Sequence, residues 1–309
     1  MTIGVLGGSG LYEFAGMAEV RETPVSTPFG APSAPPMVGR FAGRRVIFIP
    51  RHGRGHRLLP SEINYRANIC ALKQLGATQV LSISAVGSMR EEIRPGDFVV
   101  PDQFIDRTHA RASTFFGDGC VGHVNFADPV CPELTAALAA GAEQAAVATG
   151  VEQAVGSGTP ASGAGGASRR GRGLHRGGTY VTIEGPQFST RAESNMYRSH
   201  GVNVIGMTGV TEAKLCREAE LCFAVLALAT DYDCWHPEEA SVTATAVVDV
   251  LRANIAGAQE VLRHTLPALP TPRLCACAHA VRHAILTSKD AISLAARERL
   301  RALYGRDID

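Results

Sequence analysis

Short apolar runs alternate with longer helical patterns along this chain of 309 residues, and this alternation restricts its fold more than any other feature. Strands separated by helices in this order are typical of an α/β domain whose sheet is largely parallel. The expected strands cover residues 2–6, 45–49, 79–84, 98–100, 179–183, 202–206 and 222–229, and the expected helices cover residues 61–75, 132–147, 191–200, 211–217, 246–265 and 288–304. We therefore predict a single α/β domain with a central, largely parallel or mixed twisted sheet flanked by helices.

Two segments fall outside this regular pattern. A Pro-rich link at 267–272 ends it, so we expect a domain over residues 1–272 and a helical extension of the same domain over 273–309. The segment 156–176 is rich in Gly, Ser and Arg and has too few apolar residues to pack on a core. We interpret it as a flexible surface insertion, with a basic nucleic-acid-binding segment as the alternative.

The composition limits the partners of the protein. Hydrophobic residues make up 45% of the chain, which allows a sizeable core, and the formal net charge of +1 argues against a general nucleic-acid partner. No apolar run is long enough to cross a bilayer and the N-terminus lacks the charged start of a signal peptide, so we expect a cytoplasmic protein without a membrane partner.

The eight cysteines lie mostly in apolar context, which is typical of reduced, buried thiols in a cytoplasmic protein. Cys275 and Cys277 are too close in sequence to form a zinc knuckle alone. We favour two buried thiols there over a strained bridge between them.

Two aspartates, Asp231 and Asp233, follow the apolar run 222–229 within the sequence ATDYDCW at 229–235. Ligands of open α/β sheets bind beyond the carboxyl ends of the strands, which is where these side chains are expected. A carboxylic acid can donate a hydrogen bond to N7 of a purine, and a carboxylate can accept one from an exocyclic amine. The pair therefore suits a 6-amino purine; the alternative is a solvated loop with a helix cap.

Groups able to bind an anion follow four of the expected strands. They are Ser9 within GGSGL (7–11), Arg51 with His52, Ser84 with Ala85, and Thr208. Each signal is weak alone, because a tight turn or a solvated basic loop explains it equally well. Together, hydroxyls, backbone N–H groups and one arginine at corresponding strand ends suit inorganic phosphate. His52 and His56 could instead hold zinc, but the intervening glycines oppose a helix and no third ligand is evident, so we expect no metal.

Taken in order, these motifs resemble those of the trimeric nucleoside phosphorylases. The segments that carry the resemblance are GGSGL (7–11), TPFG (27–30), RHG (51–53), NYRAN (64–68), GSMREE (87–92), PGD (95–97), DQFIDRT (102–108), TIEGP (182–186) and TDYDCW (230–235). They cover roughly residues 2–148 and 178–267, and the insertion and the longer C-terminus after residue 272 depart from the family pattern.

The resemblance implies a nucleoside phosphorylase-like fold and the phosphorolysis of methylthioadenosine to adenine and 5-methylthioribose 1-phosphate. It assigns phosphate to Ser9, Arg51, His52, Ser84, Ala85 and Thr208; the nucleoside to Met207, Phe188, Asp231, Tyr232, Asp233 and His123; and substrate preference to Ser189 and Ala244. Asp231 is the expected acid at N7, with Asp233 as its catalytic partner. No cofactor is implied, because phosphate is a co-substrate, and a homotrimer is implied, in which His123 faces a neighbouring subunit.

Three other functions stay open. One is a phosphorylase of other purine nucleosides (adenosine, inosine or guanosine), although the aspartate pair argues against a 6-oxo purine. Another is a nucleosidase that uses water, which the arginine and hydroxyl set argues against. The third is a non-catalytic nucleotide-binding module, which would bind tightly without turnover.

Overall fold

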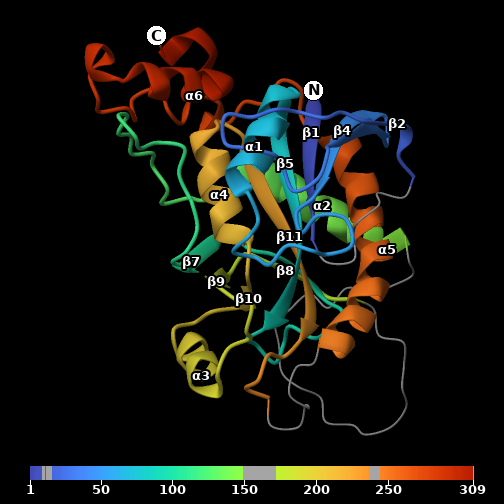
Figure 1. Cartoon of the computed structure of the whole chain (residues 1–309). Helices are drawn as coiled ribbons and strands as arrows, with labels where there is room; N and C mark the ends of the chain where they lie inside the picture. Colours follow the sequence, from blue (N-terminus) through green and yellow to red (C-terminus); the bar gives the residue numbers. More distant parts are fainter. Residues whose placement is uncertain (9–10, 12–15, 149–171, 237–243, 309) are drawn as a thin grey trace, which may run out of the picture.

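An 11-stranded mixed sheet forms the centre of the computed structural model, which describes residues 1–8, 11, 16–148, 172–236 and 244–308 (Figure 1). The strands are β1 (Thr2–Gly7), β2 (Ala18–Glu22), β3 (Met37–Phe41), β4 (Arg44–Pro50), β5 (Ala77–Ser88), β6 (Phe98–Val100), β7 (Gln103–Arg107), β8 (Leu174–Arg176), β9 (Thr179–Ile183), β10 (Val204–Gly206) and β11 (Cys222–Asp231). Their main order is β2-β3-β4-β1-β5-β10-β9-β7, and β11, β6 and β8 continue from the other edge of β5.

Helices cover both faces of this sheet (Figure 1). They are α1 (Tyr65–Gln74), α2 (Pro132–Ala148), α3 (Arg191–Ser199), α4 (Gly209–Glu218), α5 (Ala244–Ala268) and α6 (Leu294–Tyr304), with short 3-10 turns η1 (Ala276–His279), η2 (Lys289–Ala291) and η3 (Gly305–Ile308). Helices α1 and α4 pack together on one face, and α2 and α5 pack together on the other. None of the described helices is long and apolar enough to cross a membrane.

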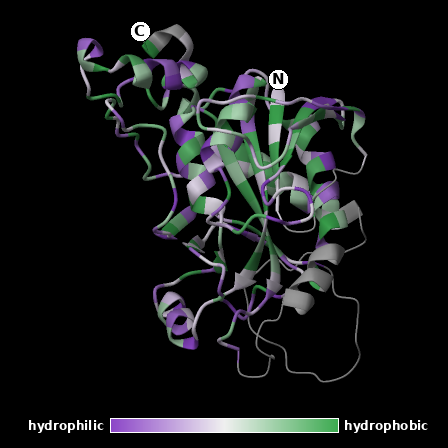
Figure 2. Ribbon diagram, in the orientation of Figure 1, coloured by the Kyte–Doolittle hydropathy of each residue, from purple (hydrophilic) through white to green (hydrophobic). Residues whose placement is uncertain are grey.

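Strand β11 shows why the sheet is buried on both faces. Phe223 and Val225 belong to the core cluster under α1 and α4, whereas Ala224 and Leu226 belong to the cluster under α2 and α5. Side chains alternate between the two faces of a strand, so a strand covered on both sides is apolar throughout. Figure 2 shows these central strands as mostly hydrophobic and α3, which buries only Ser194 and Tyr197, as largely hydrophilic.

Strand β5 is the longest strand and holds the site in place. Strand β1 pairs with its first part and ends with Gly7 opposite Ile83, while β10 pairs antiparallel with its last part and places Ile205 opposite Gly87. Strand β11 occupies the other edge of β5 throughout this region. One edge of β5 is therefore without a strand partner over residues 84–86, among the residues that the structure describes. This break leaves backbone groups available to a ligand.

The structure confirms the predicted α/β fold, and each expected strand corresponds to an observed one. The sequence reading missed β2, β3, β7 and β8, which are short or exposed strands at the sheet margins. The first helix was expected from residue 61 but begins at Tyr65, because the Asn64 side chain caps it by accepting from the N–H of Ala67 at 3.1 Å.

The predicted insertion at 156–176 needs a correction at its C-terminal end. Residues 174–176 form β8, which pairs in parallel with β6, and Arg172 donates to the carbonyl of Gly96 at 2.8 Å. A flexible segment extending to residue 176 is thus wrong for these residues, because the PGD turn before β6 provides their partners. The remaining part, 156–171, lies outside the described residues.

The C-terminal extension packs against the same core as the rest of the domain. Val281, Ala296, Leu300 and Leu303 are buried in the cluster that also contains α1. In Figure 1 this segment, drawn in red, caps the end of α1 and lies beside the loop that follows β7. The extension therefore has no separate core of its own.

Candidate active site

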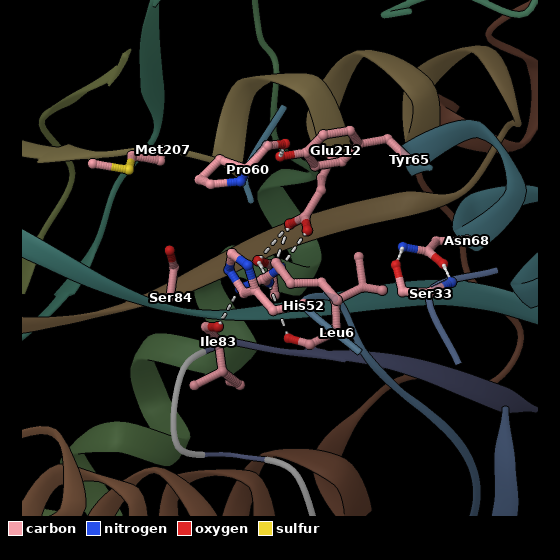
Figure 3. Close-up of polar contacts among 12 residues, drawn as sticks. Leu6, Ser33, His52, Pro60, Tyr65, Asn68, Ile83, Ser84, Met207 and Glu212 are labelled. Atoms are coloured by element: carbon pink, nitrogen blue, oxygen red, sulfur yellow. Dashed lines mark hydrogen bonds and ion pairs between the residues drawn. The ribbon is translucent and has the colours of Figure 1, made fainter. Parts of the chain in front are cut away.

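The guanidinium of Arg51 lies at the centre of the strand ends but points into the core. Arg51 is 1% exposed and donates to both carboxylate oxygens of Glu212, from Nε at 2.6 Å and from Nη2 at 3.3 Å. It also donates to the carbonyls of Leu6 and Ile83 and to the hydroxyl of Ser82. Burial raises the pKa of Glu212, and the charge of Arg51 opposes that rise. Figure 3 shows Glu212 reaching from α4 toward these strands.

This buried pair changes what a substitution of Arg51 would report. Removing one member of a buried ion pair leaves the other charged and unpaired, at a cost of about 3–5 kcal/mol. A loss of phosphate affinity in Arg51→Ala would then be mixed with a loss of stability. The main structural role of Arg51 is to hold the ends of β1 and β4, the middle of β5 and α4 together.

Nη1 of Arg51 lies against Gly8, the residue that follows β1. A guanidinium has five N–H donors, and the contacts above leave one hydrogen of Nη1 without an acceptor among the described residues. A Cβ atom on Gly8 would lie 2.7 Å from this Nη1 and 2.7 Å from the carbonyl oxygen of Ile83. Glycine is therefore required at position 8, because any larger residue would collide with the guanidinium and with the backbone of β5.

His52 is buried next to Arg51 and is neutral. Its Nδ1 lies 2.9 Å from the carbonyl oxygen of Leu58, which only accepts, so Nδ1 carries the proton and Nε2 is an acceptor. Burial lowers the pKa of His52 to about 4, while the contact with Leu58 opposes the shift. The rings of His52 and His56 stack with centroids 4.3 Å apart, and no third metal-ligating side chain joins them among the described residues.

Thr208 offers an unused hydroxyl at a helix N-terminus. It is the N-cap residue of α4, is 4% exposed, and its Oγ1 has no hydrogen-bond partner among the described residues. Strand β10 runs back along β5, so the chain that leaves it carries Thr208 toward Ser84. Ser84 is 4% exposed and its Oγ lies 3.2 Å from the hydroxyl of Tyr180. Unpartnered N–H groups and hydroxyls at a helix N-terminus favour an anion.

Asp231 and Asp233 lie close together at the end of β11 but in different environments. Asp231 accepts from the hydroxyl of Thr230 at 2.7 Å and from the backbone N–H of Asp233 at 2.8 Å. Asp233 is 5% exposed, and burial raises its pKa, while a hydrogen bond with Ser194 opposes the rise. A Cβ on Gly87 would lie 3.0 Å from Oδ1 of Asp231. The glycine of β5 therefore allows the carboxylate to lie against the strand.

Aromatic contacts fix the loop that holds the aspartates. Trp235 is 7% exposed, and its indole N–H donates to the carbonyl of Ser88 at 2.7 Å. Tyr232 is half-buried; it donates to the carbonyl of Glu91 at 3.3 Å and packs edge-on against Trp235. The loop is thus anchored to the end of β5, and the solvated-loop reading of the aspartates does not fit.

Arg111 organises the opposite wall of the site. Its guanidinium donates to the carbonyl of Met207, to the carbonyl of Glu184 at 2.6 Å and to a carboxylate oxygen of Glu184 at 3.2 Å. Although burial opposes it, hydrogen bonds from the N–H groups of His109 and Ala110 and the Arg111 charge lower the pKa of Glu184. Met207, half-buried, is held in this way beside Ser84, as Figure 3 shows.

Other expected site residues are placed less fully. Phe188 is 49% exposed in the loop before α3, and the Oγ of Ser189 is buried without a partner among the described residues. Ala244 is the first residue of α5, but its side chain is not among the described ones, and Ser9 lies outside the described residues. Ala85 is half-buried in the part of β5 that has no strand partner on one edge.

His123 lies in a separate, outward-facing hollow of about 490 Å³. Thr114, Phe116 and Lys214 also line this hollow. The N–H of His123 donates to the carbonyl of Ala284 at 2.8 Å, so the C-terminal extension holds its loop. The chain does not by itself bring His123 to the aspartates.

Sequence reasoning missed the residues that position the site. One signal was present: Leu215 and Cys216 follow Glu212 by three and four residues, which puts this carboxylate on the apolar stripe of its helix. A carboxylate in that place needs a cation or a proton. Arg111 follows the DQFIDRT motif with no comparable signal, and its partners Glu184 and Met207 lie more than 70 positions away.

Comparison with known proteins gives the family. Residues 2–267 match the family described as the phosphorylase superfamily, and the chain belongs to it. The chain is 53% identical over 304 residues to the S-methyl-5'-thioadenosine phosphorylase of Geobacter sulfurreducens, with 98% of each chain covered. It is 49% identical over 304 residues to the protein of the same name from Koribacter versatilis, covering 98% of this chain and 96% of that protein. These alignments include the C-terminal extension.

Solved structures share the fold. The crystal structure of methylthioadenosine phosphorylase sourced from an Antarctic soil metagenomic library superposes with a TM-score of 0.84 at 43% identity, covering 97% of this chain and 98% of that chain. Methylthioadenosine phosphorylase from Schistosoma mansoni in complex with adenine gives a TM-score of 0.75 at 36% identity, covering 86% and 91%. The resemblance read from the motifs is therefore confirmed at the level of family and fold.

The neutral state of His52 predicts a loss of stability in acid. The unfolded chain takes up a proton near the ordinary pKa of 6.5, whereas the folded chain does so only near about pH 4. The unfolded state binds more protons in this window, so stability is lost as the pH falls through it. Between pH 7 and pH 5 we expect His52 to account for about 2 kcal/mol of lost unfolding free energy. Urea unfolding of wild type and His52→Gln at both values measures it, and equal losses would contradict the assignment.

Proposed function

We propose that this protein is an enzyme that cleaves S-methyl-5'-thioadenosine with inorganic phosphate, giving adenine and 5-methylthioribose 1-phosphate. The relatives that match nearly the whole chain carry the name of this activity, and one similar solved structure holds adenine. The observation that carries the proposal is the arrangement of the strand ends. The break beside β5 lies next to half-buried Asp231 and buried Asp233 at the end of β11.

Phosphate would bind in the break beside β5. The free N–H of Arg51, the hydroxyls of Ser84 and Thr208 and the N-terminus of α4 can donate to its oxygens. Nε2 of His52 is an acceptor, and a protonated phosphate oxygen can donate to it. Phosphate held in this way would lie below the sugar, stabilise the cationic character of C1' as the glycosidic bond breaks, and then attack that carbon. The Ser9 hydroxyl completes the set that the family resemblance assigns.

The leaving adenine would be met by the aspartate pair. Of the two, Asp233 is the better proton donor, because burial raises its pKa, whereas Asp231 accepts two hydrogen bonds that favour an ionised carboxylate. This reverses the roles first assigned to them. Asp233 would protonate or hydrogen-bond N7 as negative charge develops on the base, and Asp231 would accept from the exocyclic amine. Phe188 and Met207 would pack on the base and sugar, and Ser189 and Ala244 would tune substrate preference.

The proposed reaction is tested by adenine release from methylthioadenosine with and without phosphate. A phosphorylase releases adenine only when phosphate is present and forms methylthioribose 1-phosphate in equal amount. Release at the same rate without phosphate would make the protein a nucleosidase. Tight binding with no release would make it a binding module, and faster turnover of inosine would favour another purine nucleoside phosphorylase.

Thr208→Val should raise the phosphate KM by about tenfold and leave stability nearly unchanged. The variant removes a donor worth about 1.5–3 kcal/mol to a charged ligand. Its hydroxyl has no partner among the described residues, so no internal bond is lost with it. Steady-state kinetics and thermal melting measure the two effects. Thr211→Val is the matched control, since Thr211 is a buried threonine on the same helix whose hydroxyl also lacks such a partner. A similar rise in both variants would remove Thr208 from the phosphate site.

Substituting the two aspartates should change different kinetic parameters. Asp233→Asn should lower kcat for methylthioadenosine by about 100-fold or more, since it removes the proposed acid. Asp231→Asn should instead move the ratio of kcat/KM toward inosine, because an amide N–H can donate to an oxygen at C6. Measuring both substrates with both variants separates the roles. If Asp231→Asn gives the larger fall in kcat and Asp233→Asn the change in preference, the roles are the reverse.

We also propose a cytoplasmic homotrimer whose products feed purine and methionine salvage. The family resemblance supports this assembly, as does the exposed position of His123 in a hollow away from the aspartates of its own chain. A neighbouring subunit would then receive His123 near the 5' end of the nucleoside. Sedimentation of the active protein should give the mass of three chains, and full activity in a monomer would exclude the assembly.

A further inference from the structure

Four cysteine sulfurs meet at the end of the sheet opposite the active site. Cys131, Cys222, Cys275 and Cys277, here termed the thiol cluster, have Sγ atoms that all lie within 4.8 Å of one another. Cys222 and Cys275 approach to 3.2 Å, which is too long for a disulfide bond. The other four cysteines of the chain lie outside this group. Side-chain packing alone gives no reason for four sulfurs to face one another.

The thiol cluster comes from three distant parts of the chain. Cys131 immediately precedes α2, Cys222 begins β11, and Cys275 and Cys277 lie at the start of the C-terminal extension. Cys131, Cys222 and Cys277 are at most 4% exposed, and Cys275 is half-buried. The group is therefore closed, with no open position for a substrate. Since β11 spans ten residues from Cys222 to Asp231, about 30 Å separates the cluster from the aspartates.

Two positively polarised groups lie beside the thiol cluster. Cys131 immediately precedes α2, so it lies at the N-terminus of that helix, where the helix dipole is positive. Arg273 is fixed by the carbonyls of Thr78 and Glu220, and its Nη1 lies 3.9 Å from Sγ of Cys222.

We propose that the thiol cluster binds one zinc ion through four thiolates and thereby fixes the C-terminal extension to the sheet. Zinc in structural sites is tetrahedral, with bonds to sulfur of about 2.3 Å, so its four sulfurs lie about 3.8 Å apart. Shifts of about 1 Å or less bring the observed sulfurs to that spacing. Each thiol that becomes a ligand releases its proton to solvent, and Arg273 and the α2 N-terminus stabilise the resulting negative site. This differs from the expectation of no metal, which was formed from the His52 and His56 pair and from the judgement that Cys275 and Cys277 are too close to bind zinc alone.

The metal content of the full-length protein tests the proposal directly. Protein purified under reducing conditions should contain about one zinc per chain by elemental analysis, or should take up one when zinc is added. Cobalt added after zinc removal should give the strong visible bands of a tetrahedral cobalt–thiolate centre. Absence of zinc with no uptake overturns the proposal, as does iron in place of zinc or a disulfide within the cluster found by thiol titration and mass spectrometry.

Cysteine variants inside and outside the thiol cluster show which residues bind the metal. Cys275→Ser and Cys277→Ser should each reduce zinc at least fivefold and lower the melting temperature, because the extension loses its link to the sheet. Cys70→Ala, which changes a buried thiol of α1 outside the cluster, should keep about one zinc per chain. Zinc retained in both serine variants overturns the assignment. Wild-type metal content decides the question even if a variant does not fold, and adenine release bears only on the proposed function.

Discussion

The buried ion pair between Arg51 and Glu212 is the interaction on which the site depends. It joins the turn after β4 to α4, and through Leu6, Ser82 and Ile83 it also fixes β1 and β5. A charge this deep is tolerated only when it is paired with an opposite charge and hydrogen-bonded. The pair therefore commits the sequence to one arrangement of these strand ends. The groups that we propose bind phosphate are positioned as a consequence, since His52 follows Arg51 directly, Ser84 belongs to β5 and Thr208 precedes α4.

The site divides its electrostatics between two places. Near β5 the groups are neutral or already paired. His52 is uncharged, Thr208 offers a neutral hydroxyl, and Arg51 forms an ion pair with Glu212. Such a place can receive phosphate without repelling it and without a fixed excess of positive charge. At the end of β11, two aspartates only two residues apart lie in different surroundings. Burial raises the pKa of Asp233, whereas Asp231 accepts hydrogen bonds from Thr230 and from the backbone N–H of Asp233. Chemically identical side chains thus differ because of their surroundings alone.

The sequence predicted local structure and failed where distant residues meet. Strands 98–100 and 179–183 were placed correctly because their apolar β-rich runs are bounded by turn residues. The aspartates were placed correctly because they follow an apolar run that both sheet faces bury. Glu212 was missed because its partner lies 161 residues away, and Arg111 because its acceptors are mostly carbonyls, which carry no sequence signal. The cysteines at 275 and 277 were read in isolation, and only the fold joins them to Cys131 and Cys222.

Residues 117–123, within the loop after β7, are held by the C-terminal extension. The carbonyl of Val121 accepts from the N–H of Leu286 at 2.9 Å, Gly122 forms a bridge with Ile285, and Arg299 of α6 donates to the carbonyl of Gly117 at 2.7 Å. The strand ends around β5 and this outer loop therefore depend on separate parts of the chain. Substitutions in the extension can change the conformation of this loop while the groups around β5 keep their geometry. Related proteins can therefore differ in the loop at residues 117–123 and in the extension while the residues around β5 stay the same.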